Sequence, residues 1–502
     1  MNPPATNMRL DGLLKGYADA PPLPVSGISL DSRAVRAGDT FFALRGSQQH
    51  GLKYLPQVEA AGASAVVWEK SEDISVPHAS VPAVGVDQLS AHLGEIAARF
   101  YGQPSEDLFV AGVTGTDGKT STAHLIAQWL QLCGVSCAYF GTLGVGSVGA
   151  LQATQHTTSD AITVQKSLAE VVRRGVSACA MEVSSHALDQ HRVGGVRFDA
   201  VVLTNVGRDH LDYHGSQAAY AAAKRRLFEA ADQRAMIINR DDAQGARWIA
   251  EGPATADHLS SLLVYGLDGD RPAAGRYLLG RGLHLDADGL RLHLDSSWGA
   301  AALRAGLLGR FNAYNLLAAL AVVLNNGVSL QDALAVSAQL RTVPGRAEAF
   351  RAKDGGPLVV VDYAHTPQAL QQILQAMKAH AAGRLICVFG CGGERDAGKR
   401  PLMARSAADG ADVVIVTDDN PRREDPAKIV EQIVAGFTHQ DRYQIEHDRK
   451  AAIAQAIDQA HAGDVVVIAG KGHETTQDIG GHKHRFSDRA LVAARLGLEL
   501  AS

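Results

Sequence analysis

The chain has 502 residues, enough for about three domains of ordinary size. Hydrophobic residues make up 46% and charged residues 20%, a balance typical of globular proteins, and the formal net charge of -5 argues against nucleic acid as a partner. No stretch approaches the roughly 20 apolar residues of a membrane-spanning helix, and the N-terminal sequence MNPPATNMRLDGLL lacks the pattern of a secretory signal. We therefore expect a cytoplasmic protein that does not insert into membranes.

The five cysteines include two pairs with a spacing of four residues, Cys133 with Cys137 and Cys387 with Cys391. A zinc site is one interpretation of these pairs. The paired C-x-x-C and histidine spacings of known zinc sites are missing, however. We therefore favour ordinary thiols in a reducing cytosol.

The first predicted domain covers residues 1–105. Its clearest segments are SGISLDSRAVRAGDTFFALRG (26–46) and GASAVVWEK (62–70), and it ends after the helical run AHLGEIAARF, at the turn-forming sequence YGQPS. Glycine is frequent, with 51 residues, and aromatic residues make up 5% of the chain. This mixture suits α/β layers with tight turns, so we expect a small α/β domain.

The second predicted domain covers residues 106–341. Four apolar segments, LFVAGV, ACAMEV, AVVLTNV and AMIIN, alternate with segments of helical period such as AITVQKSLAEVVRR. This alternation predicts a parallel, doubly wound sheet. The later segment GLHLDADGLRLHLD has a period of two around Asp288-Gly289 and predicts a hairpin, and NAYNLLAALAVVLNN predicts a helix after it.

The third predicted domain covers residues 342–502. The segments PLVVVDY, RLICVFG, DVVIVTD and DVVVIAG are separated by helical sequence, which predicts a second, Rossmann-like sheet. Ligands of such sheets bind beyond the carboxyl ends of the strands. Four polar clusters follow the predicted strands at this edge: residues 362–365, 390–393, 418–420 and 470–474.

A glycine-rich turn follows the first strand of the second domain. Its sequence GTDGKT, residues 115–120, lies between strand and helix, as in phosphate-binding loops. Backbone N–H groups of such a loop point at phosphate oxygens, Lys119 adds positive charge, and the Thr120 hydroxyl is a magnesium ligand. The full pattern G-x-x-x-x-G-K-[ST] requires glycine at 113, where this chain has Val113. The alternative is a glycine-rich turn that binds no nucleotide.

Two further polar residues follow the next two predicted strands. Glu182 ends the first of them, and His210 lies shortly after the second. We expect these strands to be neighbours, so that both side chains converge near the phosphate-binding loop. A buried Glu182 requires a cation, and Mg²⁺ would supply one. The alternative for each residue alone is a solvated loop position.

The string VTGTDGKT resembles the GT-x-GKT loop of the Mur ligases and folylpolyglutamate synthetases, which are ATP-dependent, amide-forming enzymes with three domains. The resemblance extends over essentially the whole chain and includes the fairly specific strings DYAHTP and GKGHE. It implies Mg²⁺ as cofactor and ATP as co-substrate. The implied ATP contacts are Gly115, Thr116, Asp117, Gly118, Lys119, Thr120, Ser121, Asn312, Asn315, Arg346, Asp362 and His365.

Lys224, in the helical segment AAKRRLF, matches a lysine that is carbamylated in the Mur ligases. A carbamate is an anion that binds Mg²⁺, whereas an ammonium would be repelled, and CO₂ reacts only with a neutral lysine. A desolvated site close to cations favours the neutral form because it lowers the lysine pKa. The resemblance thus implies a metal site and a catalytic set. The implied metal ligands are Thr120, Glu182, His210 and carbamylated Lys224, and the catalytic residues are Lys119, Lys224, Glu182 and His210. A charged surface on this helix is the alternative.

Other matches imply a nucleotide-peptide substrate in one branch of this family. His156 stands where asparagine is common in the family. In the first domain, LDSR and GSQQ resemble the uridine-diphosphate pocket. The implied contacts to this substrate are Leu30, Ser32, Ser47, Gln48, Gln49, His156, Thr157, Thr158, Ser184, Gln190 and Arg192.

The stretch TDDNPRREDP, residues 417–426, restricts the resemblance to one branch of the family. DNPR marks the branch that adds meso-diaminopimelate to UDP-N-acetylmuramoyl-L-alanyl-D-glutamate. Arg422 can bind the distal carboxylate of diaminopimelate in bidentate fashion, and Glu474 can accept its ammonium. The implied contacts to the amino acid are Arg395, Asp419, Asn420, Pro421, Arg422, Gly470 and Glu474. Further along, Asp425 is expected to cap a helix with Pro426 in its first turn.

The resemblance implies an ATP-dependent ligase of cytoplasmic peptidoglycan precursor synthesis. Its partners would be the UDP-N-acetylmuramoyl dipeptide, ATP and meso-diaminopimelate, and we expect a monomer. The alternatives within enzymes are a lysine-adding sibling ligase or a folylpolyglutamate synthetase. A nucleotide-dependent binding or regulatory protein with a degenerate loop is the alternative from another class.

Overall fold

The computed structural model of the chain divides into two compact units. The first unit comprises Met1–Tyr265, Pro272–Arg276 and Ala318–Val328, and the second comprises Gly266–Arg271, Tyr277–Leu317 and Ser329–Ser502. The structure describes residues 8–46, 49–72, 74–75, 78–154, 156–229, 235–252, 261–273, 275–352, 355–439 and 443–500. No helix in these ranges is both long and apolar enough to cross a bilayer.

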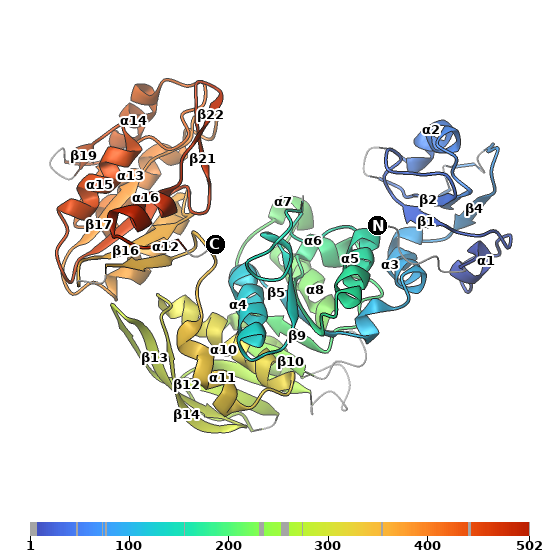
Figure 1. Ribbon diagram of the computed structural model, residues 1–502, viewed down its shortest axis with the longest axis horizontal. Helices are drawn as coiled ribbons and strands as arrows, with labels where there is room; N and C mark the ends of the chain where they lie inside the picture. Colours follow the sequence, from blue (N-terminus) through green and yellow to red (C-terminus); the bar gives the residue numbers. More distant parts are fainter. Residues whose placement is uncertain are drawn as a thin grey trace. The chain divides into compact units, whose positions relative to one another are not determined.

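The N-terminal part of the first unit contains a small, fully parallel sheet with the strand order β1-β2-β3-β4 (Figure 1). Helix α3 packs on one face, where Leu93 and Ile96 join a core with Phe42 and Val67. The predicted small α/β domain is confirmed. The elements are β1 (Gly27–Ser29), β2 (Asp39–Ala43), β3 (Ala65–Glu69), β4 (Ala83–Val86), α1 (Leu10–Leu13), α2 (Leu55–Ala60) and α3 (Leu89–Phe100).

Seven strands of a ten-stranded sheet form the central layer here, in the order β11-β10-β9-β5-β8-β6-β7. All neighbouring pairs are parallel except β6 with β7. The strands are β5 (Phe109–Thr114), β6 (Cys137–Gly141), β7 (Gly144–Gly146), β8 (Ala178–Glu182), β9 (Ala200–Leu203), β10 (Ala235–Asn239) and β11 (Leu262–Leu267). Strand β5 lies between β9 and β8, and the strand order changes direction there. Doubly wound sheets bind their ligands at such a switch point. The predicted doubly wound sheet is confirmed.

Helices cover both faces of this sheet (Figure 1). The core on one side includes Leu168 of α5 together with Met181 and Val201 from the strands. The helices are α4 (Lys119–Leu132), α5 (Ala161–Arg173), α6 (Ser185–Asp189), α7 (Leu211–His214), α8 (Gln217–Arg225) and α9 (Ala243–Glu251).

An antiparallel meander opens the second unit. The expected hairpin is confirmed: β12 pairs with β13, and Asp286 lies opposite Gly289, which has a φ of 127° that favours glycine. The expected helix after it is also present, as α10. The elements are β12 (Arg276–Asp286), β13 (Gly289–Ser296), β14 (Gly299–Ala305), α10 (Arg310–Asn325) and α11 (Leu330–Val336).

The C-terminal sheet of the second unit has the order β15-β16-β20-β17-β18-β19, parallel except for β15. Helices α12, α13 and α14 pack on one face, and α15 and α16 on the other. The four predicted strands and the Rossmann-like arrangement are confirmed. The strands are β15 (Glu348–Arg351), β16 (Leu358–Asp362), β17 (Leu385–Phe389), β18 (Val413–Val416), β19 (Gln444–Ile445) and β20 (Val465–Ala469). The helices are α12 (Pro367–Lys378), α13 (Lys399–Gly410), α14 (Pro426–Val434), α15 (Arg449–Asp458) and α16 (Asp488–Arg495).

Two local features complete the second unit. Helix α14 begins at Pro426, and the Asp425 side chain accepts a hydrogen bond from the Ala427 N–H, so the predicted cap is confirmed. A polar hairpin of β21 (Thr476–Ile479) and β22 (His482–Arg485) was not predicted from the sequence. The three-domain α/β architecture is as expected, and the boundaries at residues 105 and 341 stay predictions.

All five cysteines are free thiols, and all but Cys133 are buried. Burial raises the pKa of Cys137 and Cys387 to about 12, so neither forms a thiolate readily at neutral pH. Within the described ranges, no group of three or more His, Cys, Asp or Glu side chains is arranged to hold a metal ion.

Candidate active site

The glycine-rich loop joins the buried end of β5 to the N-terminus of α4. Val113 is a strand residue paired with Glu182 of β8, so glycine is not needed there. Gly115 has a φ of 151°, and a Cβ at this position would lie 1.8 Å from the Thr204 hydroxyl oxygen. Gly118 has a φ of 80° and precedes the first residue of α4. The loop is therefore shaped by its two glycines and presents the N-terminus of a 14-residue helix, which favours anions.

Lys119 is held by its own loop. Its Nζ donates hydrogen bonds to the carbonyl oxygens of Gly115, at 2.8 Å, and Thr116, at 2.7 Å. Burial lowers the pKa of this lysine, although the carboxylates of Glu182 and Asp117 oppose that shift. The Lys119 ammonium therefore lies beside the N-terminus of α4, and no carboxylate in the described part of the chain forms a hydrogen bond with it.

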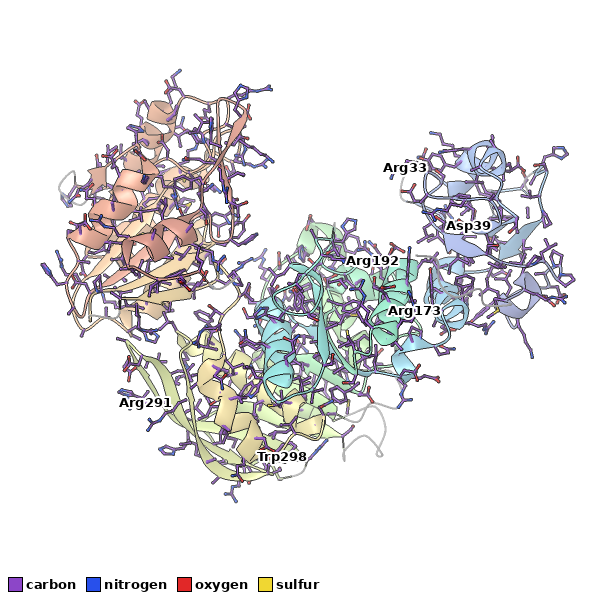
Figure 2. The ribbon with its side chains drawn as sticks, viewed as in Figure 1. Arg33, Asp39, Arg173, Arg192, Arg291 and Trp298 are labelled. Carbon is purple, nitrogen blue, oxygen red and sulfur yellow. The ribbon has the colours of Figure 1, made fainter. Side chains whose placement is uncertain are left out.

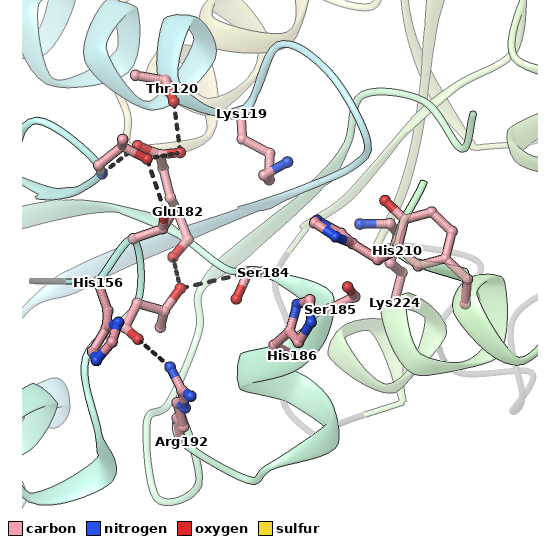
Figure 3. A pocket seen from close by; sticks show the side chains of 14 residues that line it. Lys119, Thr120, His156, Glu182, Ser184, Ser185, His186, Arg192, His210 and Lys224 are labelled. Atoms are coloured by element: carbon pink, nitrogen blue, oxygen red, sulfur yellow. Dashed lines mark hydrogen bonds between the residues drawn. The ribbon is translucent and has the colours of Figure 1, made fainter. Parts of the chain in front are cut away.

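Glu182 lies at the carboxyl end of β8 and is 1% exposed (Figure 3). Its Oε2 accepts a bond from the Thr120 hydroxyl at 2.7 Å, and its Oε1 accepts one from the Thr142 N–H at 2.9 Å. The Tyr139 hydroxyl also donates to Oε1, and burial raises the pKa of that phenol. These donors compensate the buried carboxylate and fix its direction towards Thr120.

Lys224, on α8, is 1% exposed. Its Nζ donates to the Gly115 carbonyl oxygen at 2.7 Å and lies 4.4 Å from the ring centroid of Tyr220. Within the described ranges no carboxylate forms an ion pair with this lysine. Burial, together with the nearby charge of Lys119, lowers the pKa of Lys224 to about 7. A neutral amine is therefore abundant at physiological pH.

His210 precedes α7 with a φ of 51°, in the left-handed region. Its ring lies 4.7 Å from the ring of His186 and 6.2 Å from that of Tyr220, centroid to centroid. The strands that carry Glu182 and His210 are not neighbours, contrary to expectation, because β5 lies between them. The two side chains consequently approach the glycine-rich loop from opposite sides of its strand.

These groups line one cavity of about 440 Å³ (Figure 3). All four predicted metal ligands, Thr120, Glu182, His210 and Lys224, are among its lining residues. A hydroxyl, a carboxylate and a carbamate are oxygen ligands of the kind that Mg²⁺ prefers. The direct Thr120–Glu182 contact and the lysine without an ion-pair partner fit this use. The other lining residues are Lys119, Thr142, His156, Thr157, Thr158, Ser184, Ser185, His186, Arg192 and Tyr220.

Five of the eleven residues expected to contact the nucleotide-peptide substrate also line this cavity: His156, Thr157, Thr158, Ser184 and Arg192. Arg192 Nη1 donates to the Thr158 carbonyl oxygen at 2.9 Å, and the Thr158 hydroxyl donates to the Glu182 carbonyl oxygen at 2.9 Å. Gln190 is not a lining residue; its Oε1 accepts bonds from the Arg192 guanidinium at 2.6 and 3.0 Å. Gln190 therefore orients Arg192. The sequence interpretation did not single out Thr142, Ser185, His186 or Tyr220 as cavity residues, although Tyr220 lies one helical turn before Lys224.

The residues expected to form the uridine-diphosphate pocket lie after β1 and β2. The Ser32 hydroxyl donates to Gln57 Oε1 at 3.2 Å, and Gln49 Nε2 donates to the Tyr54 hydroxyl at 2.8 Å. Leu30 is half-buried beside the core of the small sheet. Arg33 is exposed at this edge (Figure 2) and pairs with Asp31. Ser47 and Gln48 lie outside the described residues.

The remaining predicted ATP contacts belong to the second unit. Asp362 ends β16, where its carboxylate accepts bonds from the N–H groups of Ala347, at 2.6 Å, and Ala364, at 2.8 Å. Burial raises the pKa of Asp362 in spite of these bonds. The Arg346 guanidinium lies 5.0 Å from the Tyr363 ring centroid. Asn312 is buried, and its Oδ1 accepts a bond from the Asn315 amide at 3.0 Å. His365 is exposed, and its Nδ1 lies 2.8 Å from the Tyr363 carbonyl oxygen.

The DNPR segment follows β18, beside the residues that follow β20. Asn420 Nδ2 donates to Glu474 Oε2 at 3.0 Å, and a Cβ on Gly470 would lie 2.7 Å from Asp419 Oδ2. Pro421 is buried, and Arg395 is exposed on the loop after β17. Lys471, which the sequence interpretation did not single out, is fully buried within this cluster.

Arg422 is held through its backbone and its guanidinium. Its N–H donates to the Asp478 carbonyl oxygen at 2.9 Å, and its carbonyl oxygen accepts from Gly480 at 2.6 Å, so the β21–β22 hairpin grips the segment. Its Nη1 donates to the Gly393 carbonyl oxygen at 2.6 Å. The hairpin thus fixes the backbone of Arg422, and the Gly393 carbonyl fixes the direction of its guanidinium.

The chain is similar to known proteins over nearly its whole length. Residues 24–101 match "Mur ligase family, catalytic domain", residues 113–323 match "Mur ligase middle domain", and residues 345–472 match "Mur ligase, glutamate ligase domain". A UDP-N-acetylmuramoyl-L-alanyl-D-glutamate--2,6-diaminopimelate ligase of Alkalilimnicola ehrlichii is 49% identical over 98% of this chain and 99% of that protein. A protein of the same name from Pseudomonas putida is 47% identical over 95% of both chains.

Solved structures extend this similarity. The structure of a protein with the same enzyme name covers 98% of this chain and 99% of that chain, with a TM-score of 0.78 and 37% identity. A folylpolyglutamate synthase from Mycobacterium tuberculosis covers 74% of this chain and 91% of that chain, with a TM-score of 0.56 and 18% identity, which indicates a shared fold alone. With three family domains matched in order and a relative 49% identical over nearly its whole length, the chain belongs to the Mur ligase family.

Proposed function

We propose that this chain is an ATP-dependent, ADP-forming ligase that adds meso-2,6-diaminopimelate to the D-glutamate side-chain carboxylate of UDP-N-acetylmuramoyl-L-alanyl-D-glutamate. The observation that carries this proposal is the agreement between full-length relatives of that name and the DNPR–Glu474 cluster. A MurF ligase from Thermotoga maritima, which shares the fold, was solved in complex with ADP. The reaction belongs to peptidoglycan precursor synthesis, and we propose that the chain performs it as a cytoplasmic monomer.

The reaction has two steps. The D-glutamate carboxylate attacks the γ-phosphorus of ATP, which forms an acyl phosphate and releases ADP. The diaminopimelate amine then attacks the acyl carbon, and phosphate leaves as the amide forms. Lys119 and the N-terminus of α4 bind the phosphates and offset charge on the transferred group, so the chain contributes mainly by positioning and electrostatics.

Four residues of the cavity would hold Mg²⁺: Thr120, Glu182, His210 and Lys224 as its carbamate. When bound, Mg²⁺ would neutralise charge on the phosphate oxygens. Glu182 is prepared for this role because Tyr139 and Thr142 fix its carboxylate. Lys224 is prepared for carbamylation because its lowered pKa, about 7, supplies the neutral amine that reacts with CO₂.

Recognition of the amino acid rests on charge at its distal end. Diaminopimelate carries a distal carboxylate and ammonium, whereas lysine lacks the carboxylate. Arg422 is a carboxylate partner, and Glu474 is an ammonium partner. The alternative of a lysine-adding ligase leaves the Arg422 guanidinium without a substrate group to bind.

The test is an amino-acid panel with the purified chain, ATP, Mg²⁺ and the UDP-dipeptide, read as phosphate release and product mass. We expect turnover with meso-diaminopimelate and little with L-lysine or glutamate. Arg422→Ala should raise the KM for diaminopimelate by about tenfold or more and leave the KM for ATP within about twofold. The matched control is Arg423→Ala, which removes the exposed neighbouring arginine and should change neither constant.

Three outcomes would contradict the proposal. Preferred turnover of L-lysine would identify the sibling activity, and glutamylation of a folate would identify a folylpolyglutamate synthetase. ATP binding without acceptor-stimulated phosphate release would favour a nucleotide-dependent binding protein. An equal rise of both KM values in Arg422→Ala would assign that arginine a structural role.

A further inference from the structure

A completely buried ammonium lies at the centre of the amino-acid cluster. Lys471, the second residue after β20, is 0% exposed. Its Nζ donates to Glu474 Oε2 at 2.8 Å and to Asn420 Oδ1 at 3.0 Å, and it lies 3.8 Å from Asp419 Oδ1. The lysine thus donates two hydrogen bonds and forms a longer ion pair with Asp419. Removing it would leave Glu474 Oε2 and Asn420 Oδ1 without a shared donor and Asp419 without this ion-pair partner.

Lys471 and the Asp478 N–H together determine which way the Asn420 amide faces. Asn420 Oδ1 accepts bonds from Lys471 Nζ and from the Asp478 N–H, at 3.0 and 2.9 Å. A flipped amide would point its NH₂ group at both donors. The observed orientation directs Nδ2 to Glu474 Oε2, at 3.0 Å. Both polar atoms of Asn420 are thus engaged by the protein.

The same two residues occupy one oxygen of Glu474. Its Oε2 accepts from both Lys471 and Asn420, whereas Oε1 has no donor among the described residues. The side chain is 32% exposed, so a ligand can reach Glu474 from solvent. Burial would raise the pKa of Glu474, but the bonds from Lys471 and Asn420 outweigh it and lower that pKa. Glu474 is therefore an anion with one oxygen fixed and one available.

The guanidinium of Arg422 is likewise partly bonded to the protein and partly unbonded. Its Nη1 is used on the Gly393 carbonyl oxygen, and its Nε and Nη2 make no hydrogen bond within the described ranges. These two N–H groups form the pair that a carboxylate accepts in bidentate geometry. The cluster thus offers one fixed anion and one fixed cation.

We propose that Lys471 is a positioning residue for amino-acid selection: it locks Asn420 and one oxygen of Glu474, so that Glu474 Oε1 receives the distal ammonium of the substrate. The inference rests on the proposed function and deepens it. It also gives Asn420 a second role, because the amide that was expected to contact the amino acid holds Glu474 in place.

The test compares Lys471→Met with the wild-type chain. Methionine fills a similar volume without donors, so we expect the KM for meso-diaminopimelate to rise by about tenfold or more, with the KM values for ATP and the UDP-dipeptide within about twofold. The matched control, Lys450→Met, removes an exposed lysine of α15 and should leave all three unchanged. An unchanged KM for diaminopimelate, or an equal rise of all three, would overturn the inference.

A double-mutant cycle separates positioning from general structural support. Because Lys471 acts through Glu474, combining Lys471→Met with Glu474→Gln should cost little more than the larger single change. Multiplication of the two single effects would overturn the inference. A wild-type chain that shows no diaminopimelate-stimulated phosphate release would refute the proposed function, whereas an active wild type with an unaffected Lys471→Met would refute this inference alone.

Glu474→Gln keeps the inference testable if Lys471→Met fails to fold, because Glu474 reaches solvent. The probe is 2-aminopimelate, which keeps the distal carboxylate and lacks the distal ammonium. The wild type should prefer meso-diaminopimelate to this analogue by about tenfold or more, and Glu474→Gln should lose most of that preference. Retention of the full preference in Glu474→Gln would overturn the inference.

Discussion

Lys224 shows how one side chain can be prepared for modification by its surroundings. An ordinary lysine, with a pKa of 10.5, would be about 0.3% neutral at pH 8, whereas a pKa of about 7 makes about nine in ten molecules neutral. Burial is the main cause, and the positive charge of Lys119 adds to it. The loop carbonyl of Gly115 accepts a bond from the ammonium but carries no full charge to offset it. The site thus favours a reaction that turns this cation into an anion.

We predict that Lys224→Ala lowers the rate of phosphate release by about 100-fold or more, and that acetate partly restores it, because a small carboxylate can occupy the place of the carbamate. In the wild type, carbamate formation should increase as pH rises from about 6 to 8, since the neutral fraction increases through a pKa of about 7. NMR with isotopically labelled bicarbonate measures the carbamate. Lys166→Ala, on α5, is the control for surface lysines.

Unimpaired turnover in Lys224→Ala would refute the carbamate. Loss of activity with no carbamate signal in the wild type would assign Lys224 a role as a cation instead. The acetate experiment distinguishes a carbamate from a cation at this position. Acetate can replace the negative charge of a carbamate, whereas it cannot replace a positive charge.

At the scale of elements, local sequence patterns predicted the parts that depend on neighbouring residues. The strand–turn–helix around GTDGKT, the DG hairpin and the cap at Asp425 were all legible because each is decided within a few positions. The β21–β22 hairpin was missed although Gly480 and Gly481 form its turn. Its strand HKHR is exposed throughout and shows no apolar alternation, and the hairpin gains its partners from the distant DNPR segment.

The contacts that define the site could not be predicted from spacing. Tyr139 reaches Glu182 across 43 positions, and Lys471 reaches Asn420 across 51. Such contacts depend on the strand order, which places β8 and β9 on either side of β5 and β20 between β16 and β17. Resemblance supplied the residue types of the site. The hydrogen bonds that orient them came from the fold.

A buried arginine ties together the elements that present the DNPR segment. Arg400, on α13, is 1% exposed and donates to both carboxylate oxygens of Glu424 at 2.6 and 2.8 Å. Glu424 Oε2 also accepts from the Glu394 N–H at 3.0 Å, and Arg400 Nη2 donates to the Gly392 carbonyl oxygen at 3.2 Å. These hydrogen bonds connect α13, the loop of residues 390–394 and the start of α14.

We predict that Glu424→Gln lowers the free energy of unfolding at pH 7 by about 1–3 kcal/mol, because it weakens a charge-assisted pair with a buried guanidinium. Hydrogen bonding to Arg400 lowers the pKa of Glu424 from 4.5 to about 2. A carboxylate whose pKa is lower in the folded than in the unfolded state stabilises the fold fully only when the pH exceeds its unfolded-state pKa. The advantage of the wild type should therefore shrink as pH falls from about 4.5 towards 2.

Urea unfolding of both proteins at several pH values measures this difference. Glu431→Gln, on the exposed face of α14, is the control and should unfold like the wild type. A difference between wild type and Glu424→Gln that stays constant down to pH 3 would contradict the assignment of the low pKa to this pair.

At the scale of the whole molecule, the predicted subsites are divided between the two units. The glycine-rich loop, the proposed metal ligands and the UDP-substrate residues belong to the first unit, and Asn312, Arg346, Asp362 and the amino-acid cluster belong to the second. Each unit contains hydrophobic clusters of its own, around α5 in the first and around α12–α14 in the second. We therefore expect the stability of each unit to respond to the ligands that it binds.

We predict that calorimetry resolves two transitions, which respond to different substrates. The UDP-dipeptide should stabilise the first unit and meso-diaminopimelate the second, each by about 2.7 kcal/mol at a concentration 100 times its Kd. Core variants assign the transitions: Leu168→Ala, in α5, and Leu374→Ala, in α12, should each destabilise their own unit by about 2–5 kcal/mol. A diaminopimelate-induced shift in the transition that Leu168→Ala lowers would contradict the placement of the amino-acid subsite, because a ligand stabilises only the block whose folded state it binds.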